Sequence, residues 1–145
     1  MAGNLCEIRG VGGSMHPFIP PGSRLLVAPV IFPNRIRKGD VVGFIGEGGS
    51  VTAHRVTRTS TVHGRLVLWT RGDAQEIEEC IPEEALCYVV RRVARGPIAY
   101  RTGGAAGRLL ARIALAENRK TAAAKKLLRA LAYGSLFLLS AVRRR

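Results

Sequence analysis

The sequence is poor in cysteine and shows no pattern of metal ligands. Its 145 residues include three cysteines, Cys6, Cys80 and Cys87, and no two of them have CxxC spacing. Because their number is odd and their positions are far apart or unpaired in spacing, the cysteines argue against a disulfide framework and against a zinc site. They favour a reducing compartment. A phosphate-binding loop and a dinucleotide fingerprint are also lacking. We therefore expect neither a metal nor an organic cofactor.

Apolar runs long enough to cross a bilayer are lacking as well. The uncharged run from Ala130 to Val142 has 13 residues, whereas a spanning helix needs about 20. The residues before Ser14 are polar and glycine-rich, which predicts no signal peptide and no N-terminal anchor. The expected location is therefore the cytoplasm or the periphery of a membrane.

Acidic residues are scarce in the last third of the chain. Residues 1–100 carry 12 basic and 9 acidic side chains, a net charge of +3. Residues 101–145 carry 11 basic side chains against Glu117 alone, a net charge of +10. Gly96-Pro97 and Gly103-Gly104 interrupt regular structure between the two parts. The sequence thus predicts a domain at residues 1–100 and a basic tail at residues 101–145.

The tail has the composition of an amphipathic helix. Two segments, Ala105 to Glu117 and Thr121 to Val142, lack proline and place apolar residues at helical spacing. Arginines flank the apolar run, so we expect an interfacial helix on an anionic membrane surface. The alternative is a helix that packs on the domain or on a partner. The charge would permit nucleic-acid binding, but no recognition pattern supports it, and we do not expect it.

The first hundred residues have the pattern of short β-strands. These are rich in Val, Ile and Leu, and Gly- or Pro-bearing turns separate most of them. One helical turn is expected at Pro82-Glu83-Glu84-Ala85. Such spacing predicts a mainly β fold, a compact, bent antiparallel sheet or partial barrel. The expected strands are Leu5–Arg9, Arg24–Ala28, Val41–Ile45, Val51–Arg58, Leu66–Thr70 and Leu86–Val93.

Three polar motifs stand at the ends of these strands. Gly13-Ser14-Met15-His16-Pro17 places a hydroxyl at a turn that proline stiffens. His54-Arg55-Val56 supplies an imidazole, and Gly72-Asp73 supplies a carboxylate. A serine needs a base to become a nucleophile, and a histidine base needs an acid to orient it. The chain therefore holds the three residue types of a serine hydrolase.

In their order and local context these motifs resemble the signal peptidases of family S26 and their self-cleaving relatives of family S24. The likeness is greatest to the histidine type found in archaea and the endoplasmic reticulum. It covers residues 12 to 79, reaches faintly to about residue 95 and does not cover residues 105 to 145. The matching boxes are Ser14-Met15-His16-Pro17 with Gly22, Gly39-Asp40 with the strand after it, His54-Arg55-Val56, and Gly72-Asp73 with Glu76 to Glu79.

The resemblance implies a role for each of these residues. Ser14 would be the nucleophile and His54 the base, because no lysine lies between Asp40 and Lys120. The orienting acid would be Asp73, Glu78 or Glu79, with Asp73 ranked first. The family often has Ser or Thr two positions before the nucleophile. This chain has Gly12 there, so backbone N–H groups of the turn at Gly12 and Gly13 would stabilise the oxyanion alone.

The sequence therefore predicts a serine endopeptidase of the signal peptidase type. Its substrate would be a protein or peptide segment that binds as an extended strand along an exposed sheet edge. The resemblance implies cleavage after small residues. Three alternatives remain open: an inactive binding or accessory module with the same fold, a self-cleaving regulator, and a maturation peptidase dedicated to one substrate.

Overall fold

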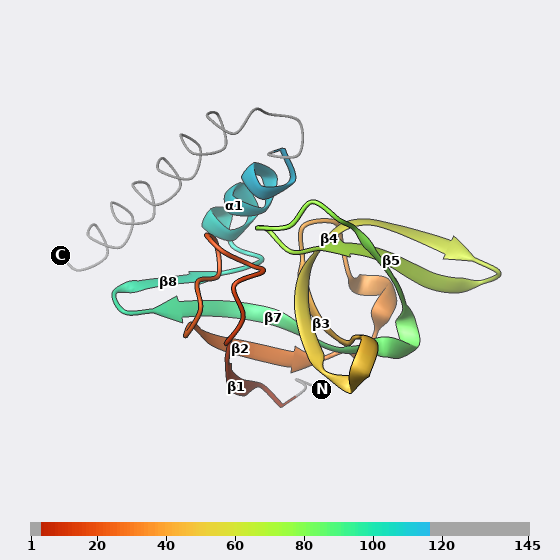
Figure 1. Ribbon diagram of the computed structural model, residues 1–145, viewed down its shortest axis with the longest axis horizontal. Coiled ribbons are helices and arrows are strands. Elements are labelled where there is room, and N and C mark those ends of the chain that lie inside the picture. Colours follow the sequence, from red (N-terminus) through yellow and green to blue (C-terminus); the bar gives the residue numbers. More distant parts are fainter. Residues whose placement is uncertain (1–3, 117–145) are drawn as a thin grey trace.

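The computed structural model describes residues 4–116, and these form one antiparallel sheet and one helix. The expected mainly β fold is confirmed, and the eight-stranded sheet is bent but not closed (Figure 1). Its strand order is β1-β2-β7-β3-β4-β5-β6, and β8 pairs with β7 beside this path. The strands are β1 (Cys6–Arg9), β2 (Arg24–Pro29), β3 (Val41–Ile45), β4 (Val51–Val62), β5 (Arg65–Arg71), β6 (Glu79–Pro82), β7 (Leu86–Arg95) and β8 (Ile98–Arg101).

The alternation of side chains along the central strands creates two hydrophobic clusters. Val41 and Val42 are neighbours on β3, yet Val41 belongs to one cluster and Val42 to the other. Val89 and Val90 on β7 divide in the same way. Successive side chains of a strand point to opposite faces of a sheet. Both faces of the central strands are therefore buried, as a strongly bent sheet requires.

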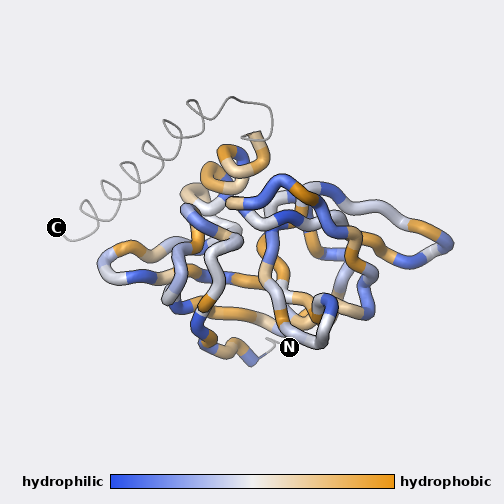
Figure 2. Tube along the Cα trace, in the orientation of Figure 1, coloured by the Kyte–Doolittle hydropathy of each residue, from blue (hydrophilic) through white to orange (hydrophobic). Residues whose placement is uncertain are grey.

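The first cluster joins the sheet to the helix and to the loop between β1 and β2. Its loop members Met15, Phe18 and Ile19 are each 4% exposed. The helix α1 (Ala105–Ala116) contributes Leu110 and Ala114 to the same cluster. Figure 2 shows apolar residues recurring along this helix and along the strands beneath it. The helix thus completes the core that supports the loop.

The sequence division at residue 100 differs from this packing. It places the helix in the tail, whereas the structure packs α1 on the β core. Gly96-Pro97 forms the turn that joins β7 to β8, and Gly96 adopts a φ of 55° there. The second expected helix, Thr121 to Val142, and the apolar run within it lie outside the described residues. Their membrane role therefore stays a prediction.

Two adjacent leucines provide a test of how α1 packs. Leu110 is 2% exposed in the core, whereas Leu109 is 49% exposed. We expect Leu110→Ala to lower the free energy of unfolding by about 2–3 kcal/mol, because it removes buried methyl groups and leaves a cavity. Leu109→Ala should change it by less than about 0.5 kcal/mol. Urea unfolding measures both, and equal effects would mean that the helix does not seal the core.

No described helix combines the length and the apolar character that a bilayer-spanning segment requires. Among residues 4–116, α1 is the one α-helix, and it has 12 residues. The other helical segments in this range are short 3-10 turns.

Candidate active site

The loop after β1 holds Ser14 at the surface, at the edge of the first hydrophobic cluster. The backbone N–H of His16 donates to the carbonyl oxygen of Gly13 at 3.0 Å, which closes a tight turn around Ser14. Met15 and the apolar residues after the turn are buried, whereas Ser14 is half-buried. The apolar residues that follow Ser14 are buried, and they fix the turn on the core. The Ser14 hydroxyl is therefore held at the surface of this turn.

A second turn, at residues 72–74 after β5, touches the serine turn through the backbone. The N–H of Ala74 donates to the carbonyl oxygen of Ser14 at 2.8 Å. A Cβ atom on Gly72 would lie 2.7 Å from the same carbonyl oxygen. Residue 72 must therefore be glycine for the two turns to approach this closely.

Asp73 in this second turn forms a buried ion pair with Arg55 of β4. The Nε and Nη2 atoms of Arg55 donate to the two carboxylate oxygens of Asp73 at 2.8 and 2.7 Å. A third donation, from Nη1, reaches the carbonyl oxygen of Gly39 at 3.0 Å. The guanidinium carbon also lies 6.0 Å from the centre of the Phe18 ring. Arg55 therefore links β4 to both turns.

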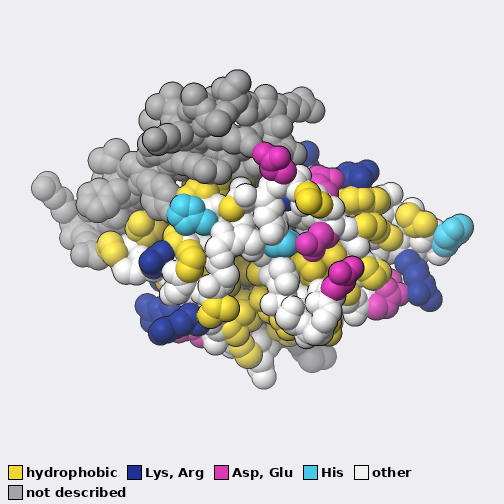
Figure 3. All heavy atoms as spheres, in the orientation of Figure 1, with side chains coloured by type: hydrophobic (Ala, Val, Ile, Leu, Met, Phe, Trp, Pro, Cys, Tyr) yellow, Lys and Arg dark blue, Asp and Glu magenta, His cyan; other side chains and the backbone are white. Residues whose placement is uncertain are grey.

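His54 lies beside Arg55 on β4 and is almost completely buried, at 2% exposure. Its ring meets Phe44 edge to face, with the centroids 5.7 Å apart. The nearest carboxylate is Glu79 of β6, whose Oε2 atom lies 3.6 Å from Nδ1. Within residues 4–116, neither ring nitrogen has a hydrogen-bond partner. Figure 3 shows acidic side chains close to a histidine on one face of the molecule.

Burial controls the protonation of His54. Loss of solvent lowers the pKa of the imidazole below its ordinary value of 6.5, and the charges of Glu79 and Asp73 offset part of this lowering. The ring is therefore neutral at pH 7. A neutral imidazole can accept a proton, which is the state that a general base needs.

The structure distributes the three candidate acids among three different partners. Asp73, ranked first from the sequence, has both carboxylate oxygens bonded to Arg55. Glu78 faces Arg58 at 3.9 Å in a solvent-exposed pair. Glu79 is the candidate acid that lies beside His54, with its Oε2 atom 3.6 Å from Nδ1. The sequence could not show which of the neighbouring residues Glu78 and Glu79 faces His54, because β6, which begins at Glu79, was not among the expected strands.

The two glycines expected to stabilise the oxyanion lie in the serine turn, and the two remaining histidines lie outside the candidate site. Gly12 and Gly13 are exposed, and a Cβ atom on either would meet no atom within 4 Å. Their backbone is therefore open to a bound group. His16 is exposed and lines a different pocket. His63, with a φ of 51°, lies in the turn between β4 and β5, far along the chain from the site.

The Ser14 side chain lines a cleft of about 260 Å³. One wall is formed by the residues from Ile8 to Gly12, and the other by Val51, Thr52 and Ala53 at the start of β4. Tyr88 also lines the cleft, and its ring covers Gly43, where a Cβ atom would lie 2.2 Å from the ring. Tyr88 and Gly43 were not recognised from the sequence, since only the pairing of β3 with β7 brings them together.

Both walls of this cleft have a free strand edge among the described residues. The strand β1 pairs with β2 and with no other described strand. The pairing of β4 with β5 begins only at Arg55, so residues 51–54 pair with β3 alone. Unpaired edges of this kind accept an extended peptide as an added strand.

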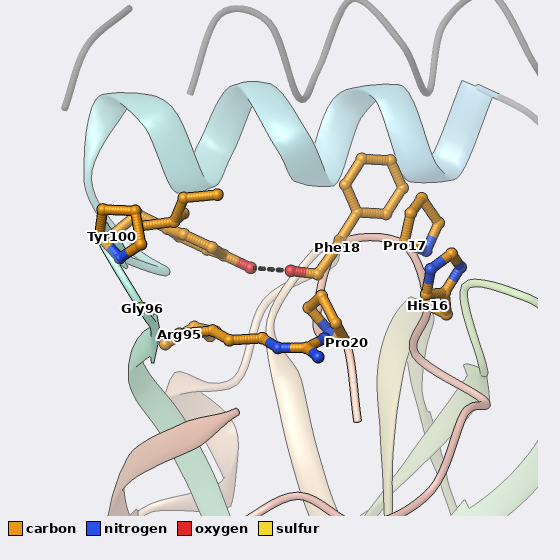
Figure 4. A pocket seen from close by; sticks show the side chains of 10 residues that line it. His16, Pro17, Phe18, Pro20, Arg95, Gly96 and Tyr100 are labelled. Carbon is orange, nitrogen blue, oxygen red and sulfur yellow. Dashed lines mark hydrogen bonds between the residues drawn. The ribbon is translucent and has the colours of Figure 1, made fainter. Parts of the chain in front are cut away.

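A second and larger pocket, of about 450 Å³, lies beneath α1 and is lined in part by the residues that follow Ser14 (Figure 4). Its lining is mostly apolar and includes Pro17, Phe18 and Pro20. The Tyr100 hydroxyl of β8 donates to the carbonyl oxygen of Phe18 at 2.8 Å. This bond fastens the segment after Ser14 to the last strand.

Among the described residues, no three His, Cys, Asp or Glu side chains are grouped so as to hold a metal ion.

Comparison with known proteins supports a distant relationship. No family model matches the chain. A stretch of 72 residues is 28% identical to Signal peptidase I W of Bacillus subtilis (strain 168). This stretch makes up 50% of the chain and 38% of that relative, so the chain spans well under two thirds of the relative's length. The similarity supports a relationship to the signal peptidases and no finer assignment.

Proposed function

We propose that this protein is a serine endopeptidase of the histidine-type signal peptidase class. The observation that supports it best is the position of His54, a buried and neutral imidazole with a carboxylate 3.6 Å from Nδ1. It precedes Arg55, whose ion pair with Asp73 fixes the turn that bonds to Ser14. Arg55 therefore ties the turn beside Ser14 to the strand that carries His54.

In the proposed mechanism, Ser14 Oγ attacks the carbonyl carbon of the scissile bond. His54 Nε2 accepts the hydroxyl proton and later gives it to the leaving amine. Glu79 accepts a hydrogen bond from Nδ1–H, which fixes the tautomer and stabilises the imidazolium that forms. Open backbone N–H groups of the turn at Gly12 and Gly13 would receive the oxyanion.

The cleft beside Ser14 suggests how the substrate binds. An extended segment can pair with the free edge of β1 or of residues 51–54, and such pairing places successive carbonyl groups reproducibly. The cleft is small, and glycine and Ala53 form part of its lining. Small side chains next to the scissile bond therefore fit best.

The test is cleavage of a peptide library by the purified full-length chain. Peptides with small residues at varied positions would be incubated with the native protein and with Ser14→Ala, and the products mapped by mass spectrometry. We expect cleavage after small residues by the native protein alone. Cleavage that survives in Ser14→Ala would refute the assignment of the nucleophile.

One observation favours a second candidate function, an inactive binding module. His54 Nε2 has no hydrogen-bond partner within the described residues, so the Ser14 hydroxyl is not bonded to it in this state. Catalytic hydrogen bonds in unliganded enzymes often tighten only when substrate binds. Peptide binding without cleavage, unchanged by Ser14→Ala, would establish the binding module instead.

The proposed base predicts the pH dependence of cleavage. His54 accepts a proton only in its neutral form, so kcat/KM should rise as pH increases through the pKa of the imidazole. Burial lowers that pKa, and we therefore expect the acid limb below pH 6.5. Glu79→Gln removes a charge that raises the pKa, so its limb should move further toward acid pH.

Glu78→Gln is the matched control, because Glu78 pairs with Arg58 and not with His54. Its pH profile should equal that of the native protein. A limb above pH 8 in the native protein would contradict a histidine base.

A further inference from the structure

Thr70 of β5 carries a hydroxyl that the fold does not use. The residue is completely buried, and its Oγ1 atom has no hydrogen-bond partner among the described residues. A buried hydroxyl without a partner costs about 1–3 kcal/mol. Valine has nearly the same shape without this cost, so stability alone would not favour threonine here.

Strand register places Thr70 between the base and its carboxylate. Thr70 pairs with Val56 of β4 on one side and with Glu79 of β6 on the other. His54 lies two residues before Val56 and therefore on the same face of the sheet. Directly paired residues have Cβ atoms about 4.5–5.5 Å apart. The Thr70 hydroxyl is thus within reach of the Glu79 carboxylate.

The Glu79 carboxylate needs a second point of attachment. Its side chain is 45% exposed, and the 3.6 Å separation from His54 Nδ1 is longer than a hydrogen bond. An exposed glutamate loses rotamer freedom when it is held in one direction. A carboxylate has two oxygens, so it can accept from Nδ1–H with one and from a hydroxyl with the other.

We propose that Thr70 is a positioning residue, whose hydroxyl donates to the Glu79 carboxylate and holds it toward His54 Nδ1. This inference rests on the proposed function for its catalytic meaning. The hydrogen bond forms when Glu79 closes on the imidazole, and the buried hydroxyl then gains the partner that it lacks in the present arrangement. Thr70 acts through Glu79 and does not touch the substrate.

The charged groups around His54 are few among the described residues. Glu79 faces it from β6, and Asp73 acts from the turn after β5 while bonded to Arg55. On the β3 side, the ring meets the apolar residues Phe44 and Val42. A change in the position of Glu79 should therefore be the main influence on the protonation of His54 when Thr70 is replaced.

The decisive measurement is the NMR titration of the His54 imidazole in the full-length chain, with the signal assigned by His54→Ala. Thr70→Val should lower the pKa of His54, because Glu79 is no longer held near the ring. Thr70→Ser keeps the hydroxyl and should leave the pKa at its native value. In a Glu79→Gln background, Thr70→Val should cause no further shift, since the carboxylate that Thr70 positions is gone.

Activity and stability give a second readout. Thr70→Val should reduce kcat for peptide cleavage by about 10- to 100-fold, the loss typical of one hydrogen bond to a charged group, and Thr70→Ser should restore most of it. The urea midpoint of Thr70→Val should be equal to or above the native value, which excludes a merely structural role. An unchanged His54 pKa in Thr70→Val would overturn the proposal.

This design separates the two inferences. If the native protein cleaves no peptide, the proposed function fails, yet the titration still decides whether Thr70 positions Glu79. If the native protein is active and Thr70→Val keeps both the native pKa and the native kcat, the positioning role fails alone.

Discussion

Replacing His54 with alanine should reduce kcat for peptide cleavage about as severely as replacing Ser14, by roughly 10⁴- to 10⁶-fold. In the proposed mechanism the nucleophile attacks only when the base removes its proton, so each variant loses the same step. The double variant Ser14→Ala/His54→Ala should therefore be no slower than either single variant. Single-turnover assays with a peptide that the native protein cleaves would measure the rates of the two single variants and the double variant.

His63→Ala is the matched control. His63 is exposed in the turn between β4 and β5 and should leave kcat unchanged. Losses that multiply in the double variant, or a His54→Ala variant that keeps most of its activity, would show that the two residues do not act as one unit.

Replacing Asp73 with alanine should lower the free energy of unfolding by about 3–5 kcal/mol. The Arg55 side chain is 5% exposed, and its two bonds to Asp73 would be lost while its charge stays buried. The turn at residues 72–74 would also lose its tie to β4. Urea denaturation of the native protein and of Asp73→Ala would measure the difference.

Glu78→Ala provides the comparison. Its partner Arg58 is 59% exposed at a distance of 3.9 Å, and exposed pairs contribute about 0–1 kcal/mol. Replacing both members of the buried pair by apolar residues, as in Arg55→Met/Asp73→Leu, should recover much of the loss. An Asp73→Ala variant as stable as Glu78→Ala would mean that the buried pair does not hold the fold.

The sequence predicted the strands that are rich in Val, Ile and Leu, most of them bounded by Gly- or Pro-bearing turns. All six expected strands are present, and the helical turn expected at Pro82 to Ala85 is the 3-10 turn Glu83–Ala85. The two strands that it missed, β6 and β8, have four residues each and contain charged side chains or lie next to proline. They owe their conformation to pairing with longer neighbours, which no local pattern reveals.

The candidate site was predictable in its parts and not in its connections. Motif order indicated Ser14 and His54, and the structure shows Ser14 bonded through its carbonyl oxygen to the turn at residues 72–74. The partner of Asp73 was not predictable, because Arg55 and Asp73 meet only through the register of β4 with β5. The same holds for Thr70, whose neighbours come from two other strands.

The bond from Tyr100 to the carbonyl oxygen of Phe18 has a consequence for the order of events during translation. It joins residues 82 positions apart, and the contact of Ser14 with Ala74 also spans most of the domain. Ser14 leaves the ribosome early, yet the turn around it gains its bond from Ala74 only after β5 has been synthesised, and the bond from Tyr100 only after β8. The proposed nucleophile therefore lacks its full support until the chain has been synthesised as far as Tyr100.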